Sequence, residues 1–183
     1  KLLRASAISR FNNSKSFEQT IKNNDLQRII DLRQSWEIDR HPYGTIDIEV
    51  INIPMNSTPD QEQPIFQSDC SEHVLLLNNS IEIKSIFNLL SEGKTTLINC
   101  HAGRDRTGVI IALVMLALHV PTRLIEKDYL ASRMNLQREQ FVHLVSAIES
   151  MGGIKELLKK YQIENDIIEK IRGWLIIEEK TGS

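Results

Sequence analysis

A strand-like run, a short polar loop and a long apolar segment follow one another just past the middle of the chain. The run TTLINC (Thr95–Cys100) predicts a strand, and TGVIIALVMLALHV (Thr107–Val120) is apolar on every side. A helix without a polar face has to be covered all round, so the second segment is expected at the centre of a domain. This strand–loop–helix unit favours an α/β fold.

The flanking segments support the same fold class. Two further strands are predicted at Gln27–Arg33 and Thr45–Met55, and Pro54 is expected to end the second. Helical spacing of apolar residues predicts helices over 16–24, 80–93, 121–133, 137–150, 154–161 and 164–178. Strands therefore alternate with helices in the first half, and the carboxyl-terminal half is helical.

Length and composition limit the class of protein. The chain of 183 residues fits a single domain, which we expect to span 1–183, and its net charge of −2 argues against nucleic-acid binding. Two cysteines are too few for a disulfide scaffold, which favours a reducing compartment. No apolar run reaches the ~18 residues of a membrane span, so no stable membrane insertion is expected. The expected location is cytoplasmic, with secretion to a host left open.

The loop after the strand has the features of an anion-binding site. Its consecutive backbone N–H groups and the following helix N-terminus provide donors and partial positive charge. Arg106 adds a planar fork that fits two phosphate oxygens, and Gly103 allows a turn without a Cβ near the ligand. Inorganic phosphate or a similar oxyanion is therefore expected to bind a set of six residues: His101, Ala102, Gly103, Arg104, Asp105 and Arg106.

Cys100 lies in the same positive surroundings. Helix N-termini and nearby cations stabilise a thiolate, so we expect Cys100 to be ionised and nucleophilic at neutral pH. In-line attack on a bound phosphate would give a cysteinyl-phosphate that water hydrolyses. The chemistry needs no metal and no cofactor. Asn99 and Thr107 are expected to support the site, with the Thr107 hydroxyl hydrogen-bonded to the sulfur.

The leaving oxygen needs a proton donor, for which carboxylic acids are suited. Asp105 is adjacent to Arg106 and is the favoured general acid. Asp60 or Glu62, in the polar segment TPDQEQ, remains an alternative.

Other polar residues have simpler interpretations. The five histidines show no metal-ligand spacing. Cys70 is interpreted as structural, with a protective disulfide to Cys100 as the alternative. Asp31 and Arg33 form either a buried structural pair or a support for the site.

The loop also carries a resemblance. Cys100 and Arg106 match the C-x5-R signature of the protein tyrosine phosphatase superfamily, and CHAGRDRTG resembles a bacterial tyrosine phosphatase family whose loop reads C-x-x-G-K-D-R-T-G. Four other segments resemble that family in the same order: LLRASAISRF, IIDLRQSWEIDRHP, KDYLASR and MGGIKELLKKYQI. The resemblance thus covers nearly the full length.

The resemblance implies a phosphotyrosine-phosphatase-like α/β fold with a central, parallel-dominated sheet flanked by helices. It implies a phosphorylated protein or peptide substrate, with Cys100 as nucleophile and Arg106 as phosphate binder. Members of the family are less strict than animal tyrosine phosphatases, so dual specificity is included. Asp105 directly before the arginine also resembles myotubularin and Sac-type loops, so a phosphoinositide substrate stays an alternative. A catalytically inactive phosphate-binding module is the third hypothesis.

Two positions depart from the family pattern. Asn99 stands where the family usually has the histidine that helps activate the thiolate, and Arg104 stands where it usually has lysine. The segments 54–100 and 129–152 leave little room for a large helical lid, which predicts a rather open site.

Overall fold

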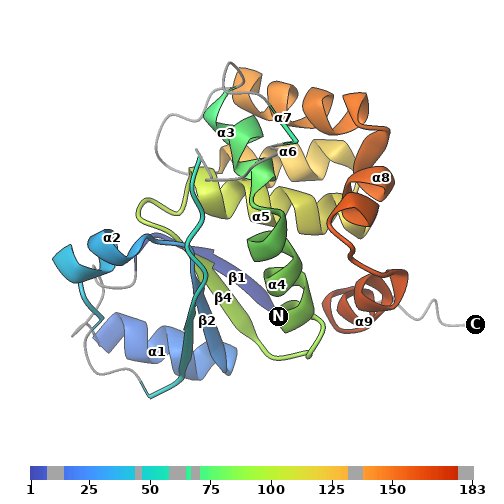
Figure 1. The fold of residues 1–183 in the computed structure, drawn as a ribbon. Helices are drawn as coiled ribbons and strands as arrows, with labels where there is room; N and C mark the ends of the chain where they lie inside the picture. The colour runs from blue at the N-terminus through green and yellow to red at the C-terminus, as the bar shows by residue number, and fades with distance from the viewer. Residues whose placement is uncertain (8–14, 44–46, 58–64, 67–70, 132–137, 177–183) are drawn as a thin grey trace, which may run out of the picture.

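Four parallel strands form the centre of the molecule (Figure 1). The computed structural model describes residues 1–7, 15–43, 47–57, 65–66, 71–131 and 138–176. The sheet order is β1 (Leu2–Ala5), β4 (Thr96–Asn99), β2 (Arg28–Asp31) and β3 (Glu49–Asn52). The α/β fold with a parallel-dominated sheet flanked by helices is therefore confirmed.

The register aligns the carboxyl ends of the strands along one edge. Ala5 and Asp31 lie on either side of Asn99, and Asp31 also pairs with Asn52. Cys100 follows Asn99 directly, so the predicted anion-binding loop starts at this edge. In open α/β sheets this edge is where ligands bind, because loops from several strands converge there.

Each face of the sheet has its own apolar cluster. Ile29 and Leu97 pack with Phe17 and Ile21 of α1 (Lys15–Asn24), whereas Ile30 belongs to the larger cluster on the opposite face. Successive side chains of a strand point to opposite faces, which explains the division. Figure 1 shows α1 on one side of the sheet and α4 (Ser80–Leu90) and α5 (Asp105–Ala117) on the other.

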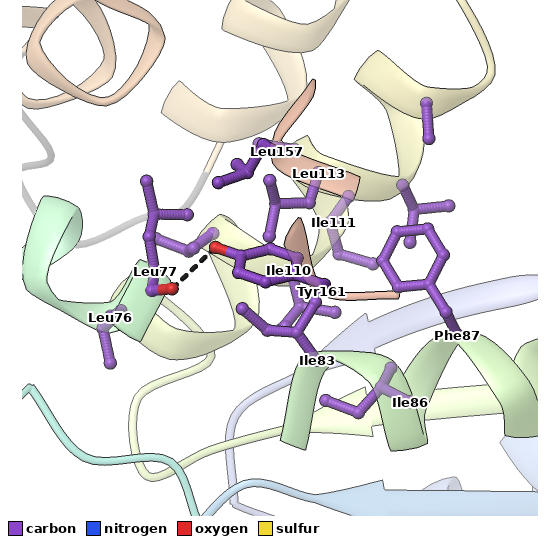
Figure 2. Packing of buried hydrophobic residues seen from close by; sticks show 14 of the residues in the cluster. Leu76, Leu77, Ile83, Ile86, Phe87, Ile110, Ile111, Leu113, Leu157 and Tyr161 are labelled. Atoms are coloured by element: carbon purple, nitrogen blue, oxygen red, sulfur yellow. Dashed lines mark hydrogen bonds between the residues drawn. The ribbon is translucent and has the colours of Figure 1, made fainter. Parts of the chain in front are cut away.

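Helix α5 lies in the middle of the larger cluster, as its continuous apolar sequence predicts. Figure 2 shows Ile110 of this helix near Ile83 of α4, and Leu113 near Leu157. The described residues of the carboxyl-terminal half form four more helices: α6 (Thr122–Leu130), α7 (Arg138–Ser150), α8 (Gly153–Lys160) and α9 (Asn165–Leu175). The prediction of a helical carboxyl-terminal half is confirmed, although α6 and α9 end earlier than predicted.

Some short elements carry too little sequence pattern to be predicted. They are β1, α2 (Ser35–Arg40), α3 (Glu72–Leu75) and the 3-10 turn η2 (Leu76–Asn78). Each has at most six residues, which is fewer than two helical turns or a clear alternation. The strand predicted at Thr45–Met55 is also shorter, since pairing ends at Asn52, before Pro54.

The described helices also bear on the membrane prediction. None of them combines the length and the apolar character that crossing a bilayer requires. The expected single domain over 1–183 and the cytoplasmic location stay predictions.

Candidate active site

The loop between β4 and α5, together with the first turn of α5, brings a cysteine, two arginines and an aspartate together. Cys100 is only 2% exposed, and the Gly103 N–H group points at its sulfur with a nitrogen–sulfur distance of 3.2 Å. Gly103 has a φ of +68°, a conformation that L side chains rarely adopt. The first turn of α5 then begins at Asp105, where unpaired N–H groups and the helix dipole favour bound negative charge.

Strand β1 fixes the loop from one side. The Arg4 guanidinium donates to the Gly103 carbonyl at 2.9 Å and to the Asp128 carboxylate of α6 at 2.7 Å. The Ala7 N–H group donates to the His101 carbonyl at 3.0 Å. Two loop carbonyls are thus held by residues of β1 and of the segment that follows it.

Helix α2 fixes Arg106 from the other side. The two terminal nitrogens of Arg106 lie 2.6 and 2.8 Å from the two Glu37 oxygens, and one of them also donates to the Leu32 carbonyl at 3.1 Å. Burial opposes ionisation of Glu37, but its hydrogen bonds with Arg106 and the Gln34 amide outweigh it and keep the pKa below the usual range. Glu37 is therefore ionised and sets the plane of the guanidinium.

Asp105 is held by two donors. His73 Nε2 lies 2.8 Å from Asp105 Oδ1, and Arg104 Nε lies 2.8 and 3.0 Å from the two carboxylate oxygens. Burial opposes ionisation, but the hydrogen bonds from His73 and Arg104 outweigh it and lower the pKa of Asp105 to about 2. In this geometry the favoured general acid is a carboxylate at neutral pH, and Arg104 is paired with it.

Behind the loop, Asn99 belongs to a buried polar network rather than to the thiol. Its amide donates to Asp31 Oδ1 at 3.0 Å, and Arg33 Nε donates to Asp31 Oδ2 at 2.8 Å, with Asp31 and Arg33 both 0% exposed. The Tyr43 hydroxyl also donates to Asp31. Asp31 and Arg33 thus form the predicted buried pair, and through Asn99 they also support the residue before the nucleophile.

Other predicted site residues are placed less directly. Thr107 is fully buried, and its hydroxyl has no hydrogen-bond partner among the described residues, so the bond expected to the sulfur is not formed there. His101 and Ala102 are partly exposed at the loop. Asp60, Glu62 and Cys70 lie outside the described residues. Within the described ranges, no group of three His, Cys, Asp or Glu side chains is arranged to bind a metal ion.

Three residues of the site were not singled out from the sequence. Glu37 stands at the end of the DLRQSWE segment, and that position in the pattern was the available signal. Arg4 is a charged residue in a strand of only four residues. His73 precedes an apolar run and is 2% exposed, and a buried histidine has no sequence signature of its own. Each contacts the loop from a distant part of the chain.

Comparison with known proteins assigns this arrangement to a family. A model of the tyrosine phosphatase family matches residues 1–171, which is most of the chain. The chain belongs to the tyrosine phosphatase family. It is also similar to the triple specificity protein phosphatase PtpB of Mycobacterium tuberculosis, with 43% identity over 47 residues. That match covers 26% of this chain and 17% of the relative's length.

Family membership gives the geometry a chemical meaning. A tyrosine phosphatase needs a nucleophile next to donors that can hold a dianion. In this chain Cys100 is the candidate nucleophile, and its sulfur is an electrostatic neighbour of both Arg104 and Arg106. The arrangement is suited to transferring a phosphoryl group to sulfur, because preformed donors would face the charge that develops on the phosphoryl oxygens.

Proposed function

We propose that this chain hydrolyses phosphotyrosine in proteins or peptides through a cysteinyl-phosphate intermediate. One observation carries the proposal: Cys100 in the loop after β4 and Arg106 in the first turn of α5 lie together at the carboxyl edge of the sheet, and Glu37 fixes the Arg106 fork. Because the Arg106 guanidinium is already held in place, phosphate binding does not have to order a long side chain, and less binding free energy is lost.

The proposed reaction has two steps. In the first, the Cys100 thiolate attacks phosphorus, the S–P bond forms, and the P–O bond to the tyrosine breaks. The phenolate oxygen leaves with a proton from the general acid, and we assign that role to Asp105. In the second, water attacks phosphorus, the S–P bond breaks, and inorganic phosphate and the Cys100 thiolate are released. Loop amides and Arg106 hold the phosphoryl oxygens in both steps.

The nucleophile is tested with Cys100→Ser. We expect the unchanged protein to hydrolyse 4-nitrophenyl phosphate in the presence of a chelator, and the variant to show no turnover. The serine variant should still bind inorganic phosphate, because the amides and Arg106 are unchanged; isothermal titration calorimetry measures this. An unchanged protein that binds phosphate but shows no turnover at any pH would instead favour a phosphate-binding module.

The acid is tested with Asp105→Asn against Asp60→Asn. For phenyl phosphate, whose leaving group needs a proton, we expect Asp105→Asn to lower kcat/KM by about 100-fold or more. The loss should be much smaller for 4-nitrophenyl phosphate, which leaves as a stable anion. If Asp60→Asn shows this pattern and Asp105→Asn does not, the general acid is Asp60 and the assignment of Asp105 is wrong.

Substrate class needs a direct comparison. The mycobacterial relative carries triple specificity in its name. We therefore compare phosphotyrosine peptides, phosphoserine peptides and soluble phosphoinositides at equal concentration. The proposal predicts the highest kcat/KM for the phosphotyrosine peptide, and a preference for phosphoinositides would support the alternative substrate.

A further inference from the structure

Three side chains from three separate helices form one continuous hydrogen-bonded chain that ends at Asp105. The Tyr129 hydroxyl of α6 lies 2.5 Å from His73 Nδ1, and His73 Nε2 of α3 lies 2.8 Å from Asp105 Oδ1 of α5. Tyr129 is 1% exposed and His73 2% exposed, so the chain reaches solvent only at its Asp105 end. Both nitrogens of a buried imidazole are thus occupied by specific partners.

The protonation states of the partners define that of the imidazole. Asp105 is ionised and can only accept, so His73 Nε2 carries a hydrogen. Burial raises the pKa of Tyr129, which keeps its hydroxyl protonated and able to donate to Nδ1. The resulting neutral imidazole fits its surroundings. An imidazolium would fit as well, because its Nδ1–H could donate to the Tyr129 oxygen instead.

The proposed reaction needs a proton that Asp105 alone does not keep. A carboxyl group with a pKa of about 2 carries a proton in roughly one molecule in 10⁵ at pH 7. Imidazole changes charge between pH 5 and 8, which suits it to store a proton under those conditions. His73 is the one imidazole that the described residues place in hydrogen-bond contact with this carboxylate.

We propose that His73 is a positioning residue that stores the proton of the cycle and passes it to the leaving group through Asp105, while Tyr129 keeps the imidazole aligned. The inference rests on the proposed phosphatase function.

The transfer conserves protons over the cycle. In the first step the Nε2 proton of the imidazolium moves to the Asp105 carboxylate, and Asp105 passes a proton to the leaving oxygen, so that Asp105 is ionised again and the imidazole is neutral. In the second step the attacking water gives a proton to Asp105, and Nε2 takes it up again. Loss of the Nε2 proton leaves the neutral imidazole with its hydrogen on Nδ1, so the Tyr129 hydroxyl accepts from Nδ1–H throughout the cycle.

The charges around His73 come from four directions. Arg104 pairs with Asp105, Glu72 lies on the same helix as His73 and interacts with Arg104, and Arg4 lies near Tyr129. The Cys100 sulfur interacts with Arg104 from the loop. From α7 the neighbour is Phe141, whose ring lies 5.3 Å from that of Tyr129. Arg104 and Glu72 therefore flank the Asp105 end of the relay, whereas Arg4, itself paired with Asp128, and the Phe141 ring lie at the Tyr129 end.

Two variants separate the proton store from the hydrogen bond. His73→Gln keeps an N–H donor for Asp105 but cannot store a proton, and Tyr129→Phe keeps the ring packing but removes the partner of Nδ1. His143→Gln, at an exposed position of α7, is the matched control. The measurement is kcat/KM against pH for phenyl phosphate and 4-nitrophenyl phosphate, with thermal melting as a check on folding.

The expected result differs between substrates. For phenyl phosphate we expect the unchanged protein to lose rate as pH rises, because the relay then no longer holds the proton that the leaving group needs. His73→Gln should lower kcat/KM at neutral pH by about 10-fold or more. It should also move the falling limb of the pH–rate profile, where kcat/KM decreases with pH, to lower pH. For 4-nitrophenyl phosphate the loss should stay below about threefold. Tyr129→Phe should shift the same limb, and His143→Gln should change neither.

Two results would overturn the relay. One is an equal loss with both substrates, which indicates a structural role; the other is an unmoved pH limb in both variants. If His73→Gln does not fold, the limb of Tyr129→Phe decides alone. Absence of turnover in the unchanged protein would contradict the phosphatase function itself. If the unchanged protein is active and His73→Gln has the same kcat/KM and pH profile as His143→Gln, only the relay is contradicted.

Discussion

At the scale of single residues, Gly103 occupies a loop position that leaves no room for a side chain. A Cβ built there would lie 2.4 Å from the Ala5 carbonyl oxygen, and the φ of +68° disfavours any L side chain. Its N–H group faces the Cys100 sulfur, so a shift of this backbone would also move a donor of the anion site.

Gly103→Ala is expected to disrupt both stability and anion binding. The positive φ alone costs about 1–2 kcal/mol, and relief of the overlap needs movement of β1 or of the loop. We expect the total loss in the free energy of unfolding to exceed that range, together with loss of measurable phosphate binding. Urea unfolding and calorimetry measure the two effects.

Gly93→Ala is the matched control, because Gly93 has a φ of +77° but nothing within 4 Å of a Cβ. It should show only the conformational cost and unchanged phosphate binding. Equal effects at the two glycines would mean that contact with Ala5 is unimportant.

At the scale of elements, α2 positions Arg106, the proposed phosphate binder. The helix has six residues, and Glu37 lies in its first turn, where it also accepts from the Gln34 N–H at 2.8 Å. The Glu37 carboxylate therefore both caps the N-terminus of α2 and holds the Arg106 guanidinium in position. The position of α2 at the end of β2 brings this carboxylate to the loop.

Glu37→Gln is expected to lower kcat/KM for 4-nitrophenyl phosphate by about 10-fold, since a charge-assisted hydrogen bond to a fixed group contributes about 1.5–3 kcal/mol. Asp39→Asn, at an exposed position of the same helix, is the control and should leave the rate unchanged. A tighter phosphate affinity with an unchanged rate in Glu37→Gln would show that Glu37 only competes for the charge of Arg106.

At the scale of the whole molecule, the carboxyl-terminal helices support the site through the core. The Tyr161 hydroxyl, just after α8, donates to the Leu77 carbonyl of η2 at 2.6 Å, and both residues are buried (Figure 2). Leu77 follows the helix that carries His73. This bond therefore ties the position of α3 to the carboxyl-terminal half.

Tyr161→Phe should destabilise the protein by about 1–3 kcal/mol, because the buried Leu77 carbonyl loses a donor and no water reaches it. The shift in midpoint on urea unfolding measures this. Ile81→Val, at a side chain 72% exposed, is the control and should stay within about 0.5 kcal/mol of the unchanged protein. An equal shift in both variants would contradict a specific role for the bond.

The sequence by itself determined the fold class, the central strand–loop–helix unit and the candidate nucleophile and phosphate binder. These features are local: apolar periodicity reports which side of a segment is buried, and Cys100 and Arg106 belong to one short loop. The same local reasoning placed Asn99 at the thiol, whereas its amide faces Asp31 in the structure. Short elements such as β1 and α2 carried too few residues for a pattern.

Only the tertiary structure decided which side chains complete the site. Gly103 is bound by Arg4 from 99 residues away, Arg106 by Glu37 from 69 and Asp105 by His73 from 32. Spacing along the chain does not record such pairs, because they arise where parallel strands end at one edge and helices meet over it. The ionisation of Asp105, on which the proposed source of the catalytic proton depends, follows in part from a distant partner, His73.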